Sequence, residues 1–116
     1  MKQLNFLPFY RPLLLSEEKT TTFRIPGATN LLMPGEKIQL TVGWPPGPFD
    51  TVGVATVAHV YEKAISELTN EDFTGESPDC QTQAATVLVL SAIYRTVLTP
   101  ETRIRIVKFG YDKSAS

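Results

Sequence analysis

Hydrophobic residues along this chain recur at spacings typical of five strands and a few short helices. We expect strands at residues 4–6, 20–25, 37–42, 52–61 and 103–111, where β-branched and aromatic residues gather or alternate with polar ones. Helical spacing predicts a short helix over residues 9–17 and a longer one that ends near Tyr94. Because the strands and helices do not alternate, the pattern predicts an α+β fold with a curled sheet.

The starts and faces of the helices give more specific expectations. Ser77, Pro78 and Asp79 follow the order of N-cap, first helical residue and first-turn acid, so we expect the long helix to begin there. Thr69 and Asp72 resemble a weak capping box that opens a short helical turn. The buried stripe of the long helix is expected to comprise Ala84, Val87, Leu88, Ser91 and Tyr94.

The two longest strands depart from simple alternation. Residues 52–61 are largely apolar on both faces, with His59 on the face of Val57 and Tyr61, which is typical of a central strand covered on both sides. In residues 103–111 the apolar phase changes between Ile106 and Val107. A bulge at that point, or burial on both faces, would explain the change.

Length and composition limit the class of protein. The chain has 116 residues, and we expect one domain over residues 1–116 with a frayed tail at 112–116. No apolar run approaches the roughly 20 residues of a membrane span, and the first residues lack the apolar core of a secretory signal. The single cysteine, Cys80, excludes an internal disulfide and a multi-cysteine zinc site. We therefore expect a cytoplasmic protein without a metal or other cofactor and without a membrane partner.

Charge is distributed unevenly, although the net charge is only −1. Residues 1–24 carry four cations against two acids, and residues 95–116 carry five against two, whereas residues 50–79 carry seven acids and one lysine. If the two termini pair in one sheet, their cations form one basic surface; scattered surface charge is the alternative. A protein that binds a long duplex usually has a basic excess, so we expect a small ligand or short strand and no long duplex DNA.

Three features of the chain have both a structural and a functional interpretation. His59, the single histidine, has no Cys or Asp at ligand spacing, and we expect it to be packed or hydrogen-bonded. Cys80 is expected to be a buried structural cysteine. The prolines and glycines of residues 43–50 predict a stiff loop. Its Trp44 and Phe49 are suited to stacking on a base or sugar, or to capping the end of a barrel.

Residues 19–24 place two cations around three threonine hydroxyls. Such a stretch is either a solvated strand edge or a site for an anionic or carbonyl-rich ligand. A threonine hydroxyl becomes a nucleophile only if a base takes its proton, and a lysine with a pKa lowered by burial is able to do so. Because side chains alternate along a strand, Lys19 can serve Thr22 only if it lies before the strand begins.

Motifs spread over nearly the whole chain resemble those of an ASCH domain, a member of the PUA-like superfamily. They are, in order, Phe9-Tyr10, Leu13-Leu14, Lys19-Thr20-x-Thr22-x-Arg24, Pro34-Gly35-Glu36-x-Ile38, Gly53-x-Ala55-x-Val57, Glu67-Leu68-Thr69, Tyr94 and Ile106-Val107-x-Phe109. The resemblance implies a small PUA-like β-barrel of about five or six strands with peripheral helices. It also implies a cleft beside the strand that contains Thr22 and Arg24.

The resemblance further implies a ligand and a chemistry. The family is thought to bind RNA or nucleotides, and its small single-domain branch includes enzymes similar to the N4-acetylcytidine amidohydrolase, which use a lysine, a threonine and a glutamate. Lys19, Thr22 and Glu76 match these residues. Because Gly75-Glu76 stands where many relatives have Glu-Gly, Glu71 and Asp72 are alternatives for the acid.

The expected ligand is a nucleoside, a nucleotide or a short single-stranded RNA. The expected ligand-binding residues are Arg24, Thr20, Tyr10 and Trp44. A non-catalytic RNA-binding module and a ribonuclease are the alternative functions. One departure from the family pattern is Glu17, which stands at a position that is often glycine.

Overall fold

The computed structural model describes residues 1–27 and 31–112, which form a curled five-stranded sheet with short helices. The strands are β1 (Lys2–Phe6), β2 (Thr21–Arg24), β3 (Lys37–Val42), β4 (Asp50–Ala64) and β5 (Arg103–Tyr111). The helical segments are η1 (Pro8–Tyr10), α1 (Arg11–Leu15), η3 (Ile65–Glu67), α2 (Asn70–Phe73), η4 (Pro78–Cys80) and α3 (Gln83–Tyr94). The predicted α+β class is confirmed, whereas residues 113–116 of the expected tail lie outside the described residues.

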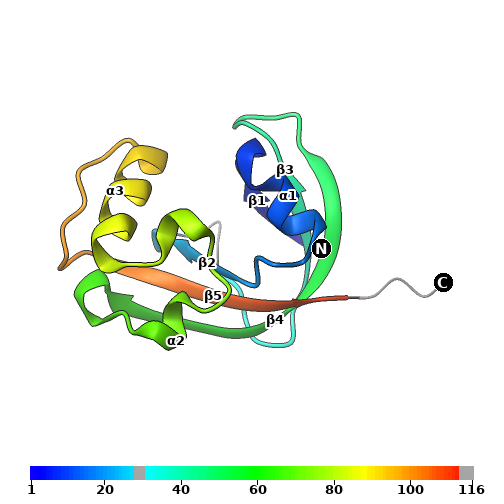
Figure 1. Cartoon of the computed structure of the whole chain (residues 1–116). Helices are drawn as coiled ribbons and strands as arrows, with labels where there is room; N and C mark the ends of the chain where they lie inside the picture. The colour runs from blue at the N-terminus through cyan, green and yellow to red at the C-terminus, as the bar shows by residue number, and fades with distance from the viewer. Residues whose placement is uncertain (28–30, 113–116) are drawn as a thin grey trace.

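The sheet curls until its two edge strands approach each other. The strand order is β1-β3-β4-β5-β2, with β1 parallel to β3 and the other pairs antiparallel. In Figure 1, β4 and β5 run through the length of the molecule, with β1, β3 and α1 near one end and α3 near the other. The guanidinium carbon of Arg24 on the edge strand β2 lies 4.7 Å from the ring centre of Phe6 on the edge strand β1. The sheet is therefore a half-barrel whose two edges face each other across a seam.

Strand β5 contributes to two separate hydrophobic clusters. Val107 and Phe109 belong to the cluster built on β1, β3 and α1, whereas Ile104 and Ile106 belong to the cluster beneath α2 and α3. Burial on both faces therefore explains the phase change between Ile106 and Val107. The bulge lies instead in the partner strand, where the register moves from Val57 opposite Phe109 to His59 opposite Lys108.

This bulge corrects the predicted faces of β4. Beyond it, Val60 packs against the same cluster as Val57, and Tyr61 packs against the other one, so the predicted shared face of Val57 and Tyr61 is wrong. The His59 side chain is exposed at the bulge and has no hydrogen-bond partner among the described residues, so the prediction that it is packed or hydrogen-bonded is also wrong. The extra residue at Ala58 shifts the side-chain period by one position, which sequence alternation alone does not reveal.

The predicted start of the long helix at Ser77 is wrong. Residues Pro78–Cys80 form the single turn η4, and α3 starts at Gln83 after an N-cap at Thr82, whose hydroxyl accepts a hydrogen bond from the Ala85 N–H at 3.0 Å. The Ser77 hydroxyl is engaged elsewhere, since it accepts a hydrogen bond from Lys19 Nζ at 2.7 Å. A side chain that serves another partner is not available to cap a helix.

The buried face of α3 also differs from the predicted stripe. Thr86 and Leu90 are the buried residues of the helix, whereas Leu88 is 71% exposed and Ala84 is exposed. The Thr86 hydroxyl donates to the Thr82 carbonyl at 2.8 Å and lies 3.3 Å from the Cys80 sulfur. Because the Thr86 hydroxyl has a hydrogen-bond partner within its own helix, the residue can be buried in the core although its side chain is polar.

The uneven charges of the sequence form ion pairs. Strands β2 and β5 do bring the two basic terminal regions together. Acids from the central region neutralise several of their cations: Arg11 pairs with Asp50 at 2.8 Å, Arg105 pairs with Glu62 at 2.9 Å, and Lys19 pairs with Glu76. These ion pairs favour scattered, partly neutralised charge, the alternative, over a single basic surface. Among the described residues, no helix has the length and apolar character needed to cross a membrane.

Helix α1 ends in a Schellman motif with Glu17 in the left-handed region. The Glu18 N–H donates to the Leu13 carbonyl at 3.0 Å and the Glu17 N–H to the Leu14 carbonyl at 3.1 Å. The φ of Glu17 is 62°, a conformation in which a side chain is strained and glycine is not.

We predict that Glu17→Gly raises the free energy of unfolding by up to about 1 kcal/mol, because it removes this strain. Urea denaturation of the two proteins at neutral pH measures the change. Glu17→Ala is the matched control, since it removes the carboxylate but keeps the Cβ. An equal gain in both variants would assign the effect to charge and refute the backbone explanation.

The capping box predicted at Thr69 is confirmed, and its acid is the centre of a buried network. The Asp72 carboxylate accepts hydrogen bonds from Tyr61 Oη at 2.6 Å, Lys63 Nζ at 2.8 Å and the Thr69 N–H at 2.8 Å. Burial acts to raise the pKa of Asp72, but these hydrogen bonds and the Lys63 charge outweigh it and lower the pKa from 3.8 to about 2.

We predict that Asp72→Asn destabilises the protein at pH 7 by roughly 1.5–3 kcal/mol, the range for hydrogen bonds to a charged group. Because the folded-state pKa of Asp72 is depressed, this stabilisation is complete above pH 4 and is lost as the pH falls towards about 2. Denaturant titrations of wild type and variant between pH 7 and pH 2 test this. The two stabilities should converge over that window, and a difference that does not vary with pH would contradict the assignment.

Candidate functional site

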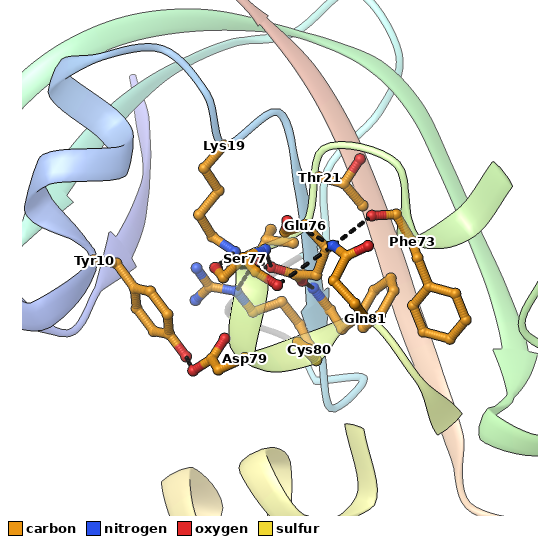
Figure 2. A network of polar contacts seen from close by, with 12 residues as sticks. Tyr10, Lys19, Thr21, Phe73, Glu76, Ser77, Asp79, Cys80 and Gln81 are labelled. Atoms are coloured by element: carbon orange, nitrogen blue, oxygen red, sulfur yellow. Dashed lines mark hydrogen bonds and ion pairs between the residues drawn. The ribbon is translucent and has the colours of Figure 1, made fainter. Parts of the chain in front are cut away.

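A buried ion pair joins the segment before β2 to the segment after α2. Lys19 precedes the first residue of β2, as the chemistry expected of Lys19 and Thr22 requires. Its Nζ donates to the carboxylate of Glu76 and, at 2.7 Å, to Ser77 Oγ. The side chains of Lys19 and Glu76 are only 3% and 4% exposed. Figure 2 shows Lys19 reaching towards Glu76 and Ser77, with Tyr10 and Asp79 beside them.

The rest of the Glu76 carboxylate is also hydrogen-bonded. One oxygen accepts from the Phe23 N–H at 2.9 Å, and the other accepts from the Ser77 N–H at 2.7 Å. Burial lowers the pKa of Lys19, and the Glu76 charge opposes that change only in part. A lysine of lowered pKa next to a carboxylate forms a pair within which a proton can move, which is a requirement for general acid–base catalysis.

Gly75 sets the position of Glu76. Its carbonyl accepts hydrogen bonds from the N–H groups of Thr20 at 2.9 Å and Thr21 at 3.1 Å, so it docks directly on the start of β2. Its φ is +86°, and a Cβ at this position would collide with the hydroxyl of Thr20. The positive φ and the collision both require glycine here. The two hydrogen bonds fix the backbone from which the Glu76 side chain reaches Lys19.

Thr22 and Arg24 stand together on β2. The Thr22 hydroxyl oxygen accepts a hydrogen bond from Arg24 Nε at 3.1 Å, and no hydrogen bond joins Thr22 to Lys19 within the described residues. The Arg24 guanidinium also lies over the Phe6 ring. In the described part of the chain, neither terminal guanidinium nitrogen of Arg24 has a hydrogen-bond partner, so both are available to a ligand.

Two adjoining hollows open at the seam between the edge strands. The inner cavity, of about 60 Å³, is lined by residues of β1, β2 and α3 and by the Lys19–Glu76 pair. The outer groove, of about 600 Å³, runs between the 43–50 loop and the end of α3. Asn5, Leu7, Arg24, Ile93 and Tyr94 line both hollows. The two are therefore compartments of one site, with Arg24 at their boundary.

The inner cavity brings together most of the site residues expected from the sequence. Lys19, Thr22, Glu76, Arg24 and Tyr10 all line it. Tyr10 uses its hydroxyl to donate to Asp79 at 3.0 Å, and its ring lies 5.0 Å from Lys19 Nζ.

The other expected site residues lie elsewhere. Trp44 lines the outer groove only. Thr20 lines neither hollow, because its side chain lies against Gly75. Of the alternative acids, Asp72 belongs to the Tyr61 and Lys63 network and Glu71 is exposed, and neither lines the cavity.

Several residues in or next to the inner cavity were not anticipated from the sequence. Ser77 carried a signal that we interpreted as a helix cap, although its position next to Glu76 was equally consistent with a polar site. Tyr94 was assigned to the buried stripe of α3, yet it is 37% exposed and its hydroxyl accepts a hydrogen bond from the Ile25 N–H at 3.2 Å. Asn5 and Phe6 lie on β1 and approach the site only through the curl of the sheet, which has no local signature in the sequence.

Metal and thiol chemistry find no support in the described residues. No group of three or more His, Cys, Asp or Glu side chains gathers within residues 1–27 and 31–112 in a way that could hold a metal ion. Cys80 is 3% exposed, as expected of a structural cysteine, and burial raises the pKa of its thiol to about 12. A thiol with so high a pKa is almost wholly protonated at neutral pH and is a poor nucleophile.

The arrangement of the sheet and its helices is similar to three solved structures. An ASCH domain from Lactobacillus crispatus JV V101 superimposes with a TM-score of 0.62 at 12% identity, over 89% of this chain and 70% of that one. The chain has the fold of an ASCH domain. A DUF984 protein from Enterococcus faecalis V583 gives a TM-score of 0.60 at 15% identity, over 89% of this chain and 69% of that one. The hypothetical protein PH0355 gives 0.64 at 14% identity, over 97% of this chain and all of that one.

Sequence comparison gives no further guidance: no family model matches the chain, and no curated protein matches it. The ASCH fold confirms the expected architecture of a small, curled five-stranded barrel with peripheral helices. At these identities the likeness concerns the fold alone.

We predict that Gly75→Ala destabilises the protein by at least about 1 kcal/mol and displaces Glu76 from Lys19, because both the φ and the contact with Thr20 exclude a Cβ. Urea unfolding measures the stability. Gly110→Ala is the matched control, since no atom lies within 4 Å of a Cβ built there. If Gly75→Ala were as stable as the control variant, the glycine requirement would be refuted.

Proposed function

We propose that the protein binds a nucleoside or nucleotide at the seam and hydrolyses the amide of an N4-acylated cytosine. The single observation that carries the proposal is the buried Lys19–Glu76 pair in a cavity that Thr22 and Arg24 also line. The inner cavity is small and largely apolar, so it suits a short acyl group. The cytosine in the proposal rests on the resemblance of Lys19, Thr22 and Glu76 to the residues of the amidohydrolase branch.

The hydroxyl of Thr22 is the nucleophile in this mechanism. Its oxygen already accepts a hydrogen bond from Arg24 Nε, so its own hydrogen remains free for a base. The neutral amine of Lys19 takes that hydrogen as Thr22 Oγ1 attacks the acyl carbon. Arg24, whose terminal nitrogens are available, stabilises the negative charge that develops on the acyl oxygen.

The Lys19–Glu76 pair then returns the proton. The cytosine amine leaves as its bond to the acyl carbon breaks, and it takes a proton from the pair. A water molecule hydrolyses the resulting ester of Thr22 and restores the hydroxyl. The hydrogen bond between Lys19 and Glu76 lets the carboxylate hold or pass the proton between the two steps.

A binding module without chemistry is the second candidate, and one observation favours it. Thr22 is hydrogen-bonded to Arg24 and not to Lys19, so the nucleophile and base are not in contact in the unliganded protein. Catalytic hydrogen bonds often form only in the complex, which leaves the hydrolase the better-supported function. A binding module would retain affinity for the nucleoside and give no turnover.

We predict that Lys19→Ala and Thr22→Val each lower the turnover of N4-acetylcytidine by at least about a hundredfold, the usual contribution of a catalytic base or nucleophile. Release of cytidine, followed by chromatography, is the measurement. Thr22→Ser is the matched control because it keeps a hydroxyl, and it should retain far more activity than Thr22→Val. Because Lys19→Ala leaves Glu76 buried and unpaired, thermal unfolding of each variant must show that it is folded.

The pH profile supplies an independent readout of the same mechanism. The base must be neutral, so kcat/KM should rise with pH through the pKa of Lys19, at a midpoint below its ordinary value of 10.5. If the wild-type protein binds cytidine derivatives but releases no cytidine, the hydrolase is refuted and the binding module is the remaining function. Absence of both binding and turnover would overturn the proposed function altogether.

A further inference from the structure

Most of the outer groove has no role in the proposed reaction. It is about ten times larger than the inner cavity, at about 600 Å³ against about 60 Å³, and lies within the range of ordinary ligand sites. An acylated cytosine that reacts with Thr22 occupies only the inner cavity and the boundary between the hollows at Arg24. The far end of the groove, formed by Trp44, Pro45, Phe49 and Arg95, is left without a role.

The charge of the groove is opposite to that of the whole protein. The chain has a net charge of −1, yet the described residues that line the groove include Arg24 and Arg95 and no acid. The Arg95 side chain has no ion-pair or hydrogen-bond partner among the described residues. In contrast, Arg11, Arg103 and Arg105 are paired with carboxylates. A hollow with two available guanidinium groups and no carboxylate favours an anionic ligand.

Arg95 occupies a position where its backbone is strained. It ends α3 in a second Schellman motif, with its N–H donating to the Ala92 carbonyl and the Thr96 N–H to the Ser91 carbonyl. Its φ is 52°, and glycine is the residue that usually fills this position. The strain of a non-glycine residue here is consistent with a side chain retained for its contact with a ligand.

Aromatic rings complete the groove. Trp44 is 61% exposed, and Phe49 and Tyr94 line the same hollow. The loop that carries Trp44 is held in place, because the Asn5 amide donates to the Gly43 carbonyl at 3.0 Å and the Gly43 N–H to the Phe6 carbonyl at 3.1 Å. Its far end is held by the Arg11–Asp50 ion pair. An exposed indole on a fixed loop is a stacking surface that does not have to be ordered on binding.

We propose that the outer groove is a second-nucleotide subsite, so that the site takes a single-stranded oligonucleotide in preference to a free nucleoside. The inference rests on the proposed function for the placement of the first base at the seam. The neighbouring base stacks on Trp44, and the phosphate that links the two nucleotides lies between Arg24 and Arg95. Base stacking on aromatic rings together with cations along the backbone is the usual composition of single-strand sites.

The test compares the affinities of penta-cytidylate and cytidine 5′-monophosphate by calorimetry. We expect the pentamer to bind at least about fivefold more tightly, since one stacked base contributes roughly fivefold or more. Trp44→Ala should reduce this ratio by about fivefold or more. Arg95→Gly should lower the slope of log affinity against log salt for the pentamer by about 0.7. Because glycine relieves the strained φ, Arg95→Gly should not lower the stability of the fold.

The controls separate these effects from general ones. Leu88→Ala removes an exposed apolar side chain on α3, and Arg103→Gln removes an arginine on β5. Neither residue lines the groove, and neither substitution should change the affinity ratio or the salt slope. Ribo- and deoxyribo-pentamers are measured in parallel to distinguish RNA from single-stranded DNA.

Each outcome has a defined meaning. Equal affinity for monomer and pentamer would overturn the second subsite and leave the proposed function intact. Preference for the pentamer that survives both Trp44→Ala and Arg95→Gly would also overturn it. If neither ligand binds while cytidine is still released from N4-acetylcytidine, the subsite is wrong and the hydrolase stands. If there is no binding and no turnover, the proposed function itself fails.

Discussion

The buried contact between Lys19 and Glu76 determines the arrangement of the whole site. It joins the chain before β2 to the chain after α2, and it is supported by the Gly75 carbonyl on one side and the Ser77 hydroxyl on the other. Removing one partner of such a buried pair typically destabilises a protein by about 3–5 kcal/mol, because the other charge is left without compensation. The same contact engages the Ser77 hydroxyl, which is followed only by the single turn η4, while α3 begins at Gln83 after its own N-cap at Thr82. One interaction thus positions the wall of the inner cavity.

Local patterns predicted the strands well and the long-range relations poorly. The boundaries expected for β3 and β5 match the structure, because alternation and β-branched residues act within a strand. The bulge at Ala58, the exposure of His59 and the rotated face of α3 depend on partners distant in sequence. The residues of the inner cavity were anticipated mainly through a family resemblance. Phe6, Asn5 and Tyr94 were not, because only the closure of the sheet brings them to Arg24.

The open seam of the barrel explains why a site exists at this place. A closed barrel would pair the edges of β1 and β2 and leave no room between them. Here the Arg24 guanidinium and the Phe6 ring meet across the edges, and α3 covers the gap with Leu90, Ile93 and Tyr94. The two hydrophobic clusters on either side stabilise the walls of the site. The polar groups at the seam are therefore held in position by these walls and do not have to form a hydrophobic core themselves.

The pairing of β2 with β5 has a consequence for how the protein is made. Residues 21–24 leave the ribosome early, but their only partner in the described sheet, residues 103–111, is synthesised about 80 residues later. At ordinary translation speeds this interval is roughly 4–16 s. During that time β2 is an unpaired strand that contains two threonines and Phe23; Arg24 is its last residue, and Lys19 lies two residues before its first. Charges at the ends of an unpaired strand oppose its association with other chains. The cations of the site thus lie where charge opposes association of the nascent chain before its last strand is made.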